Sequence, residues 1–160
     1  FKKLDYPEAY RDRYLHYNGV QVDNINDTFF YIPAIGNTLS LRNMDETIER
    51  NISVREEDFL KFDTTKWNDV LYISRFTKAT KQNLRLIANQ NNVFLIQKIP
   101  AQKENTSKYY CLVFDHHLNL EMEFYLNEEI DFNAIASYPE GIIFFKPKTA
   151  SILIWSKKLD

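Results

Sequence analysis

The sequence predicts an all-β protein: consecutive four-stranded antiparallel meanders that form a partial β-propeller of about three blades, the last one incomplete. The main observation is a repeated phrase, in which a strand-like apolar run ends in proline and a second apolar run follows a short polar stretch. Because proline has no N–H to donate, it marks the point where a strand stops pairing. The runs that end in this way are Phe29–Pro33, Phe94–Pro100 and Ile142–Pro147.

The repeated phrase extends in both directions along the chain. Before each run lies a short apolar segment and then a turn built from Asn, Asp, Pro or Gly, which is the composition of a hairpin. After two of the runs a further strand is expected, at Thr47–Val54 and at Leu118–Leu126, where apolar and polar residues alternate. The third copy ends at Asp160, which leaves no room for its fourth strand. Three blades cannot close a ring, so we expect the chain to be part of a larger propeller.

The whole chain, 1–160, is predicted to be one partial propeller domain. Its units are expected at about 18–54, 83–126 and 132–160, because a four-stranded blade typically takes about 40–50 residues. An insertion at 55–82 separates the first unit from the second. Within the insertion, Thr65 is a possible cap for a short helix that uses Trp67, Val70 and Leu71, but Val70–Ile73 fits a strand equally well.

The composition excludes several functions. The net charge is −2, so there is no basic field for phosphate backbones and we expect no nucleic-acid partner. Three glycines leave no phosphate-binding loop, and we expect no cofactor. The single cysteine, Cys111, allows no internal disulfide or cysteine-based metal cluster, and its apolar surroundings predict a buried thiol. No run approaches the roughly 20 apolar residues that a membrane-spanning helix needs. Since the chain begins at Phe1 instead of Met, we expect an upstream segment outside this sequence.

The pattern resembles the TolB-like six-bladed propellers that occur as cell-envelope lipoproteins in Bacteroides-type bacteria, a family of unknown function. Three features carry the resemblance: the strand that ends in proline before an apolar strand in Thr28–Leu41, the long hairpin Asn83–Ile99, and the segment Tyr109–Leu126. The resemblance covers roughly 18–160 and would match the C-terminal half of such a protein. It implies an extracytoplasmic, lipid-anchored protein whose anchoring cysteine lies upstream of this chain.

Two polar clusters are candidates for chemistry. Asp115, His116 and His117 offer a carboxylate and two imidazoles, but they lie in an expected hairpin turn, and we predict no metal site there. Glu128, Glu129 and Asp131 are paired carboxylates between the second and third units. They carry the alternative function, a carbohydrate-active hydrolase on a propeller scaffold, which requires two carboxylates about 5–9.5 Å apart in one pocket.

The preferred function is a non-enzymatic binding or scaffold module of the cell envelope, with a protein or glycan as its unknown ligand. Propeller loops on rigid strands usually carry binding, so we expect the ligand at the rim that contains the loops after the three prolines. A third possibility is that open sheet edges pair with the rest of the chain or with another subunit. No catalytic residue is predicted. The candidate ligand-binding residues are Asn37, Trp67, Arg75, Lys103, Asn105 and Lys148.

Overall fold

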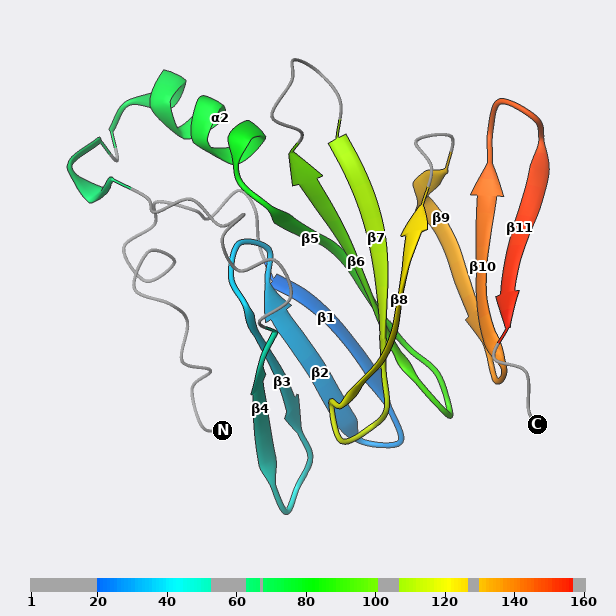
Figure 1. The fold of residues 1–160 in the computed structure, drawn as a ribbon. Coiled ribbons are helices and arrows are strands. Elements are labelled where there is room, and N and C mark those ends of the chain that lie inside the picture. The colour runs from blue at the N-terminus through cyan, green and yellow to red at the C-terminus, as the bar shows by residue number, and fades with distance from the viewer. Residues whose placement is uncertain (1–19, 53–62, 67, 101–106, 127–129, 157–160) are drawn as a thin grey trace.

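The computed structural model describes residues 20–52, 63–66, 68–100, 107–126 and 130–156, and it confirms the predicted fold class. The described residues form three antiparallel sheets of four, four and three strands, together with one α-helix. Figure 1 shows the sheets side by side in chain order. This arrangement is consistent with three successive blades of a propeller, the third of which has three strands in the described part of the chain.

Each sheet is a meander in which neighbours in sequence are neighbours in space. The first sheet contains β1 (Val20–Ile25), β2 (Thr28–Pro33), β3 (Thr38–Arg42) and β4 (Thr47–Asn51). The second contains β5 (Gln82–Ala88), β6 (Val93–Pro100), β7 (Ser107–Phe114) and β8 (Leu120–Leu126). The third contains β9 (Asp131–Tyr138), β10 (Gly141–Lys146) and β11 (Ser151–Ser156).

The turn chemistry follows the sequence. Asn26 and Asp27 join β1 to β2 with φ angles of 47° and 60°, the left-handed conformation that a two-residue hairpin turn requires and that Asn and Asp tolerate. Pro33 and Pro100 are the last residues of β2 and β6, and Pro147 directly follows β10. The predicted role of the prolines as strand ends is therefore confirmed.

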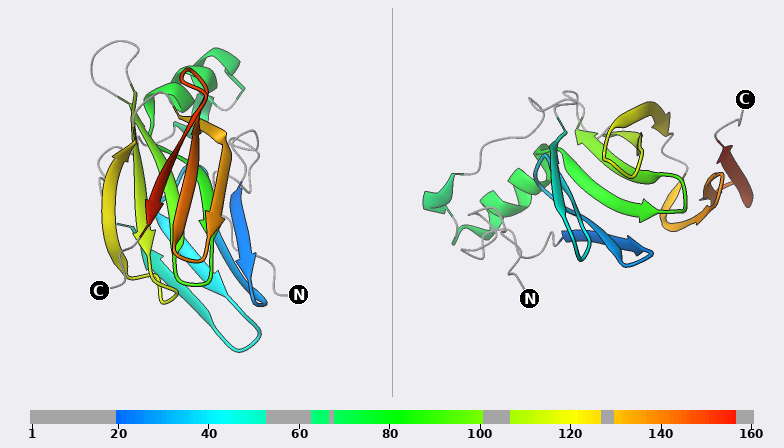
Figure 2. Two further views of the ribbon diagram at one scale, coloured as in Figure 1. Left: turned by 90° about the vertical axis from the view of Figure 1, so that its right-hand side faces the viewer. Right: turned by 90° about the horizontal axis from the view of Figure 1, so that it is seen from below.

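The first strand of each sheet lies closest to the neighbouring sheets. Strand β5 contacts both β1 and β9, whereas β4, β8 and β11 are the opposite edges of their sheets. In the end-on view of Figure 2 the three sheets follow one another as separate layers across the molecule. This is the relation that blades have in a propeller, where the first strands lie near the axis.

The second sheet is buried on both faces. Alternate side chains of a strand point to opposite faces, so Val93 and Leu95 of β6 pack toward the first sheet while Phe94 and Ile96 pack toward the third. All four are fully buried, which explains why β6 reads as a continuous apolar run. Two apolar clusters, one on each side of the second sheet, hold the three sheets together.

Asparagine side chains clamp the sheets to one another. The Asn83 amide donates to the carbonyl oxygens of Pro33 and Gly36 in the first sheet's β2–β3 connection, at 2.7 and 2.8 Å. The Asn89 amide donates to the carbonyl oxygens of Tyr138 and Gly141 in the third sheet, at 2.5 and 3.2 Å. Both asparagines are buried, so these bonds satisfy amide groups that water hardly reaches.

The insertion contains a helix, and the alternative strand at Val70–Ile73 is wrong. Helix α2 (Val70–Ala79) follows a short 3₁₀ turn, η3 (Thr64–Lys66). Its N-cap is Asp69, not Thr65, because the Asp69 carboxylate accepts a hydrogen bond from the Tyr72 N–H at 2.9 Å. None of the helical segments that the structure describes has the length and apolar character that a bilayer crossing requires.

Candidate functional site

The strand connections divide between two ends of the molecule. The β2–β3 and β10–β11 connections lie at one end of the sheets together with α2, and β6 ends and β7 begins at this same end (Figure 1); we call it the loop end. The short turns β1–β2, β3–β4, β5–β6, β7–β8 and β9–β10 lie at the other, the turn end. The strand ends that the three connections join are thus at the same end of the sheets.

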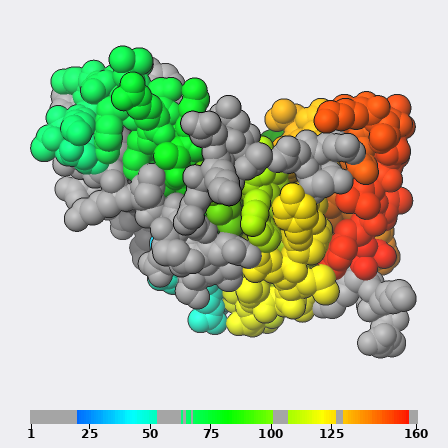
Figure 3. Space-filling view, turned by 45° about the horizontal axis from the view of Figure 1, so that its top comes forward, coloured from blue at the N-terminus to red at the C-terminus, as the bar shows by residue number. Residues whose placement is uncertain are grey.

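Three of the predicted ligand-binding residues can be placed at the loop end. Asn37 is half-buried in the β2–β3 connection, where its carbonyl oxygen accepts a hydrogen bond from the Ile52 N–H at 2.6 Å. Arg75 is exposed on α2 and Lys148 is exposed in the β10–β11 turn. Figure 3 shows α2 and the third sheet on opposite sides of this face, so Arg75 and Lys148 belong to a broad surface and not to one pocket. Trp67, Lys103 and Asn105 lie outside the described residues.

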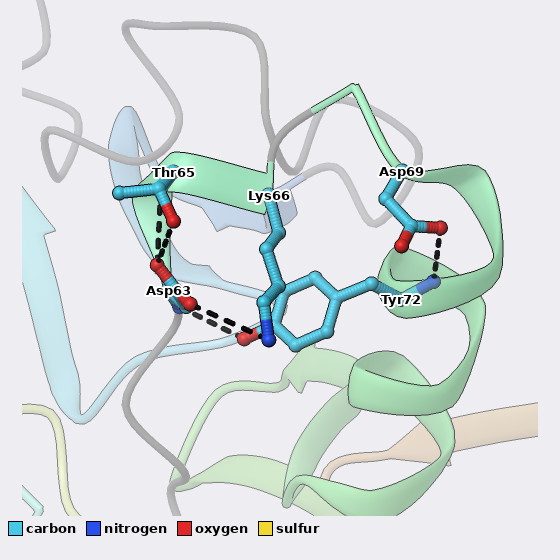
Figure 4. Close-up of polar contacts among 5 residues, drawn as sticks. All are labelled: Asp63, Thr65, Lys66, Asp69 and Tyr72. Atoms are coloured by element: carbon cyan, nitrogen blue, oxygen red, sulfur yellow. Dashed lines mark hydrogen bonds and ion pairs between the residues drawn. The ribbon is translucent and has the colours of Figure 1, made fainter.

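Helix α2 is anchored by polar contacts at its N-terminal side, drawn in Figure 4. The Asp63 carboxylate accepts hydrogen bonds from the Thr65 hydroxyl and N–H, at 2.7 and 3.1 Å, and these bonds lower the pKa of Asp63. Lys66 lies 3.7 Å from the same carboxylate and 5.1 Å from the Tyr72 ring centroid. The Tyr72 hydroxyl oxygen in turn accepts a hydrogen bond from the Asp63 N–H at 2.9 Å. These groups are one another's partners, so the cluster fixes the start of α2 against the segment that precedes it.

The histidine triplet is a structural turn, as predicted. Both Asp115 carboxylate oxygens are occupied: Oδ1 accepts from the His117 and Asn119 N–H groups, and Oδ2 accepts from the Asn119 side chain at 2.8 Å. Partial burial raises the pKa of Asp115, but the hydrogen bonds from Asn119 and His117 and the charge of His117 outweigh it, and the net pKa lies below the usual value. His116 Nε2 lies 2.8 Å from the carbonyl oxygen of Asn89.

Through His116, the triplet therefore connects the β7–β8 turn to the β5–β6 turn, which contains Asn89. The His116 ring also packs on Phe30, with ring centroids 5.7 Å apart, so this histidine links the second sheet to the first. Within the described residues, no three histidine, cysteine or carboxylate side chains are grouped so that they could hold a metal ion.

Of the three carboxylates of the hydrolase alternative, the structure describes Asp131 alone. Glu128 and Glu129 lie outside the described residues. Asp131 begins β9, and its carboxylate accepts a hydrogen bond from the Asn133 N–H at 2.9 Å, which is a local turn contact. The hydrolase alternative therefore stays a prediction.

One cavity was not foreseen from the sequence. It has a volume of about 310 Å³ and lies between the end of β4 and the β7–β8 turn. Ile52, Phe114 and Leu118 form an apolar floor, and Arg50 and Asn119 form a polar rim. Leu118 could have indicated this cavity, because it is an apolar residue within the polar β7–β8 turn. It adopts a left-handed φ of 62°, and its side chain lies in the core between the first two sheets.

Comparisons with known proteins support the fold. No family model matches the sequence, and no curated protein matches it. Among solved structures, the chain is similar to a member of the DUF4221 family from Bacteroides vulgatus, with a TM-score of 0.63 and 10% sequence identity. The likeness covers 87% of this chain and 46% of that one, so the chain spans about half the length of the solved protein. At this identity the likeness shows the fold alone, and the TolB-like assignment stays a prediction.

Proposed function

We propose that the chain is part of a β-propeller of TolB-like type that serves as a non-enzymatic binding or scaffold module of the cell envelope, and that its protein or glycan ligand meets the loop end. The observation that supports the proposal is that β2, β6 and β10 all end at the loop end, on a scaffold whose sheets are joined by two apolar clusters and by the Asn83 and Asn89 hydrogen bonds. Loops fixed in this way bind without losing much conformational entropy.

The two ends differ in how their polar groups are used. At the turn end, polar side chains form hydrogen bonds within the turns. Asn43 Oδ1 accepts from the Asp45 and Glu46 N–H groups, and Asp115 Oδ1 accepts from the His117 N–H group. At the loop end, Arg75 and Lys148 are exposed and make no hydrogen bond or ion pair with any other described residue. Exposed cations on anchored elements are suited to contact a carboxylate-bearing protein or glycan.

The cell-envelope location rests on the resemblance to envelope lipoproteins. Cell fractionation tests it directly. Recovery of the protein in the envelope fraction is the expected result, and recovery in the cytosol would remove the location from the proposal.

The binding surface can be tested without knowing the ligand. A photo-crosslinking amino acid is placed at position 75 or 148 at the loop end, and as matched controls at position 45 or 140, which are exposed turn-end positions. The purified variants are irradiated with the envelope fraction of the source cells. Discrete adducts from positions 75 and 148, suppressed by excess unlabelled protein, are expected. Adducts that are equally strong from the turn end, or absent from the loop end, would refute the proposal.

A further inference from the structure

A cation interrupts the apolar face of β4 beside the cavity. Ile48 and Ile52 both pack in the apolar cluster between the first and second sheets. Arg50, between them, lies directly opposite Leu39 of β3, which belongs to the same cluster and is fully buried. Directly opposite residues of antiparallel strands share a face, so Arg50 is on the face toward the second sheet. A charged side chain thus occupies a position where the pattern of the strand places an apolar one, and it lines the cavity.

Arg50 has no carboxylate of its own. It is exposed and makes no hydrogen bond or ion pair with any other described residue. Glu49, its neighbour in β4, lies opposite Ser40 and is therefore on the other face of the strand. Both oxygens of Asp115, in the facing turn, already accept hydrogen bonds from that turn. The guanidinium is therefore available to an acid from outside, and guanidinium–carboxylate hydrogen bonds are among the strongest in proteins.

The floor of the cavity suits an apolar body. Ile52, Phe114 and Leu118 are each at most 4% exposed, whereas Leu120, which also lines the cavity, is 44% exposed. An apolar cavity of about 150 Å³ holds benzene. The cavity of about 310 Å³ therefore has room for a body of about two fused aromatic rings, which would cover the exposed part of Leu120.

Both walls of the cavity are held in place by hydrogen bonds. The Ile52 N–H donates to the Asn37 carbonyl oxygen at 2.6 Å, and the Leu118 N–H donates to the Asp115 carbonyl oxygen at 3.0 Å. Leu118 adopts its left-handed φ of 62° in this turn, a conformation that is unfavourable for a leucine. A site whose walls are fixed before binding loses little conformational entropy when a ligand enters.

We propose that this cavity binds a small organic anion that has one carboxylate and an apolar body of about two fused rings. The carboxylate pairs with Arg50, and the apolar body lies on Phe114 and Leu118 against Leu120. Arg50 is the one cation among the described residues that line the cavity, so the site matches a single negative charge. The cavity shares no residue with the surface at the loop end, and this proposal does not rest on the function proposed above.

The test uses two probes that differ in charge alone. Naphthalene-2-carboxylate has the proposed ring size and one negative charge, and naphthalene-2-carboxamide has the same rings and no charge. Each is titrated into the native protein, and methyl resonances are followed by ¹H–¹³C NMR. We expect saturable shifts of the Ile52, Leu118 and Leu120 methyl groups, and an affinity for the carboxylate about tenfold or more above that for the amide.

Two variants separate the charge from the cavity. Arg50→Gln should weaken binding of the carboxylate about tenfold and leave binding of the amide unchanged. Arg85→Gln is the matched control, because Arg85 is exposed on β5 and does not line the cavity, so both affinities should stay as in the native protein. Leu120→Trp fills the cavity and should weaken binding of both probes. Leu120→Phe replaces it if the methyl spectrum shows that the tryptophan variant does not fold.

Three results would overturn the proposal. The first is a set of shifts that leaves out the methyl groups of Ile52, Leu118 and Leu120, as when the probes bind only to the exposed outer faces of the first and third sheets. The second is equal affinity of the native protein for the two probes. The third is undiminished binding of the carboxylate by Arg50→Gln, which would leave Arg50 only the role of an inward charge that keeps other strands from the edge of β4.

Discussion

The packing of the second sheet against the third can be tested by comparing two phenylalanines. Phe94 on β6 is fully buried between these sheets, and its ring meets Trp155 edge-on with a centroid distance of 5.7 Å and an interplanar angle of 78°. Phe29 on β2 is 51% exposed on the face of the first sheet that points away from the second. Replacing each by alanine removes the same atoms from two different environments.

The expected losses in the free energy of unfolding differ severalfold. Truncating a buried phenylalanine typically costs about 3–5 kcal/mol, including the cavity that is left. The lost edge-to-face contact with Trp155 accounts for about 0.5–1.5 kcal/mol of that range. Complete burial of a phenylalanine side chain is worth about 1.5–3 kcal/mol, so the half-exposed Phe29 should cost about 1 kcal/mol.

Urea unfolding followed by circular dichroism measures both losses. With an m-value of about 2 kcal/mol/M, Phe94→Ala should lower the urea midpoint by about 2 M and Phe29→Ala by about 0.5 M. Trp155 fluorescence should shift in native Phe94→Ala and stay unchanged in Phe29→Ala. Equal midpoint shifts for the two variants would refute the reasoning, because they would mean that the third sheet does not bury Phe94 in solution.

Four further predictions concern single residues. Asn83→Ala should lower the free energy of unfolding by about 1–3 kcal/mol, since the buried Pro33 carbonyl and the partly buried Gly36 carbonyl lose their donor. Replacing the exposed Asn91 by alanine should cost less in the same urea experiment. Gly141→Ala should cost about 1–3 kcal/mol or more, because a Cβ there would lie 2.0 Å from the Trp155 carbonyl oxygen; a thermal midpoint equal to that of the native protein would contradict this contact. Burial raises the pKa of the Cys111 thiol, so a disulfide reagent should label no thiol in native protein and one thiol after unfolding. The pKa of Asp115 is lowered in the folded state, so the carboxylate's stabilising contribution is complete above the ordinary value of 3.8 and is lost as the pH falls through the lower folded value. Between pH 7 and pH 2, the urea midpoint should therefore fall more for the native protein than for the Asp115→Asn variant. Parallel curves for the two proteins would show that the turn does not depend on the carboxylate.

The strands were predictable because their signals are local. Proline at the end of an apolar run identifies the ends of β2, β6 and β10, and Asn-rich turns identify the hairpins. Asp69 was missed as the helix cap because Thr65, four residues earlier, is an equally good capping residue; only the fold shows that Thr65 lies in a separate 3₁₀ turn and bonds to Asp63.

The regular alternation of Leu118–Leu126 was misleading for a physical reason. It predicts one apolar face, but the strand begins only at Leu120, and the pairing of β7 with β8 shifts register after Val113. Leu120 therefore lies opposite Phe114 and lines the cavity beside the first sheet, whereas Met122 lies opposite Val113 on the side of the third sheet. A bulge is set by packing between sheets, so sequence periodicity alone does not reveal it.

For the candidate binding residues, the sequence predicts which end of the sheets they lie at but not how far apart they are. Loop position could be inferred from the repeat, and Asn37, Arg75 and Lys148 do lie at the loop end. Their separation depends on how far the sheets stand apart, which no local signal in the sequence encodes. The cavity near Leu118 was missed for the same reason, because residues of β4 and of the β7–β8 turn meet only after the first two sheets pack.

The double burial of the second sheet also bears on how this sequence can change over time. An ordinary sheet strand offers every second position to solvent, where substitution is nearly neutral, but β6 and β7 have almost no such positions along their apolar centres. Each apolar residue there packs against either the first sheet or the third. A substitution on one face therefore does not relax the packing constraint on residues of the other face, such as Phe94 and Cys111. Mutational drift should therefore be slowest in the middle of the chain and fastest on the outer faces of the first and third sheets.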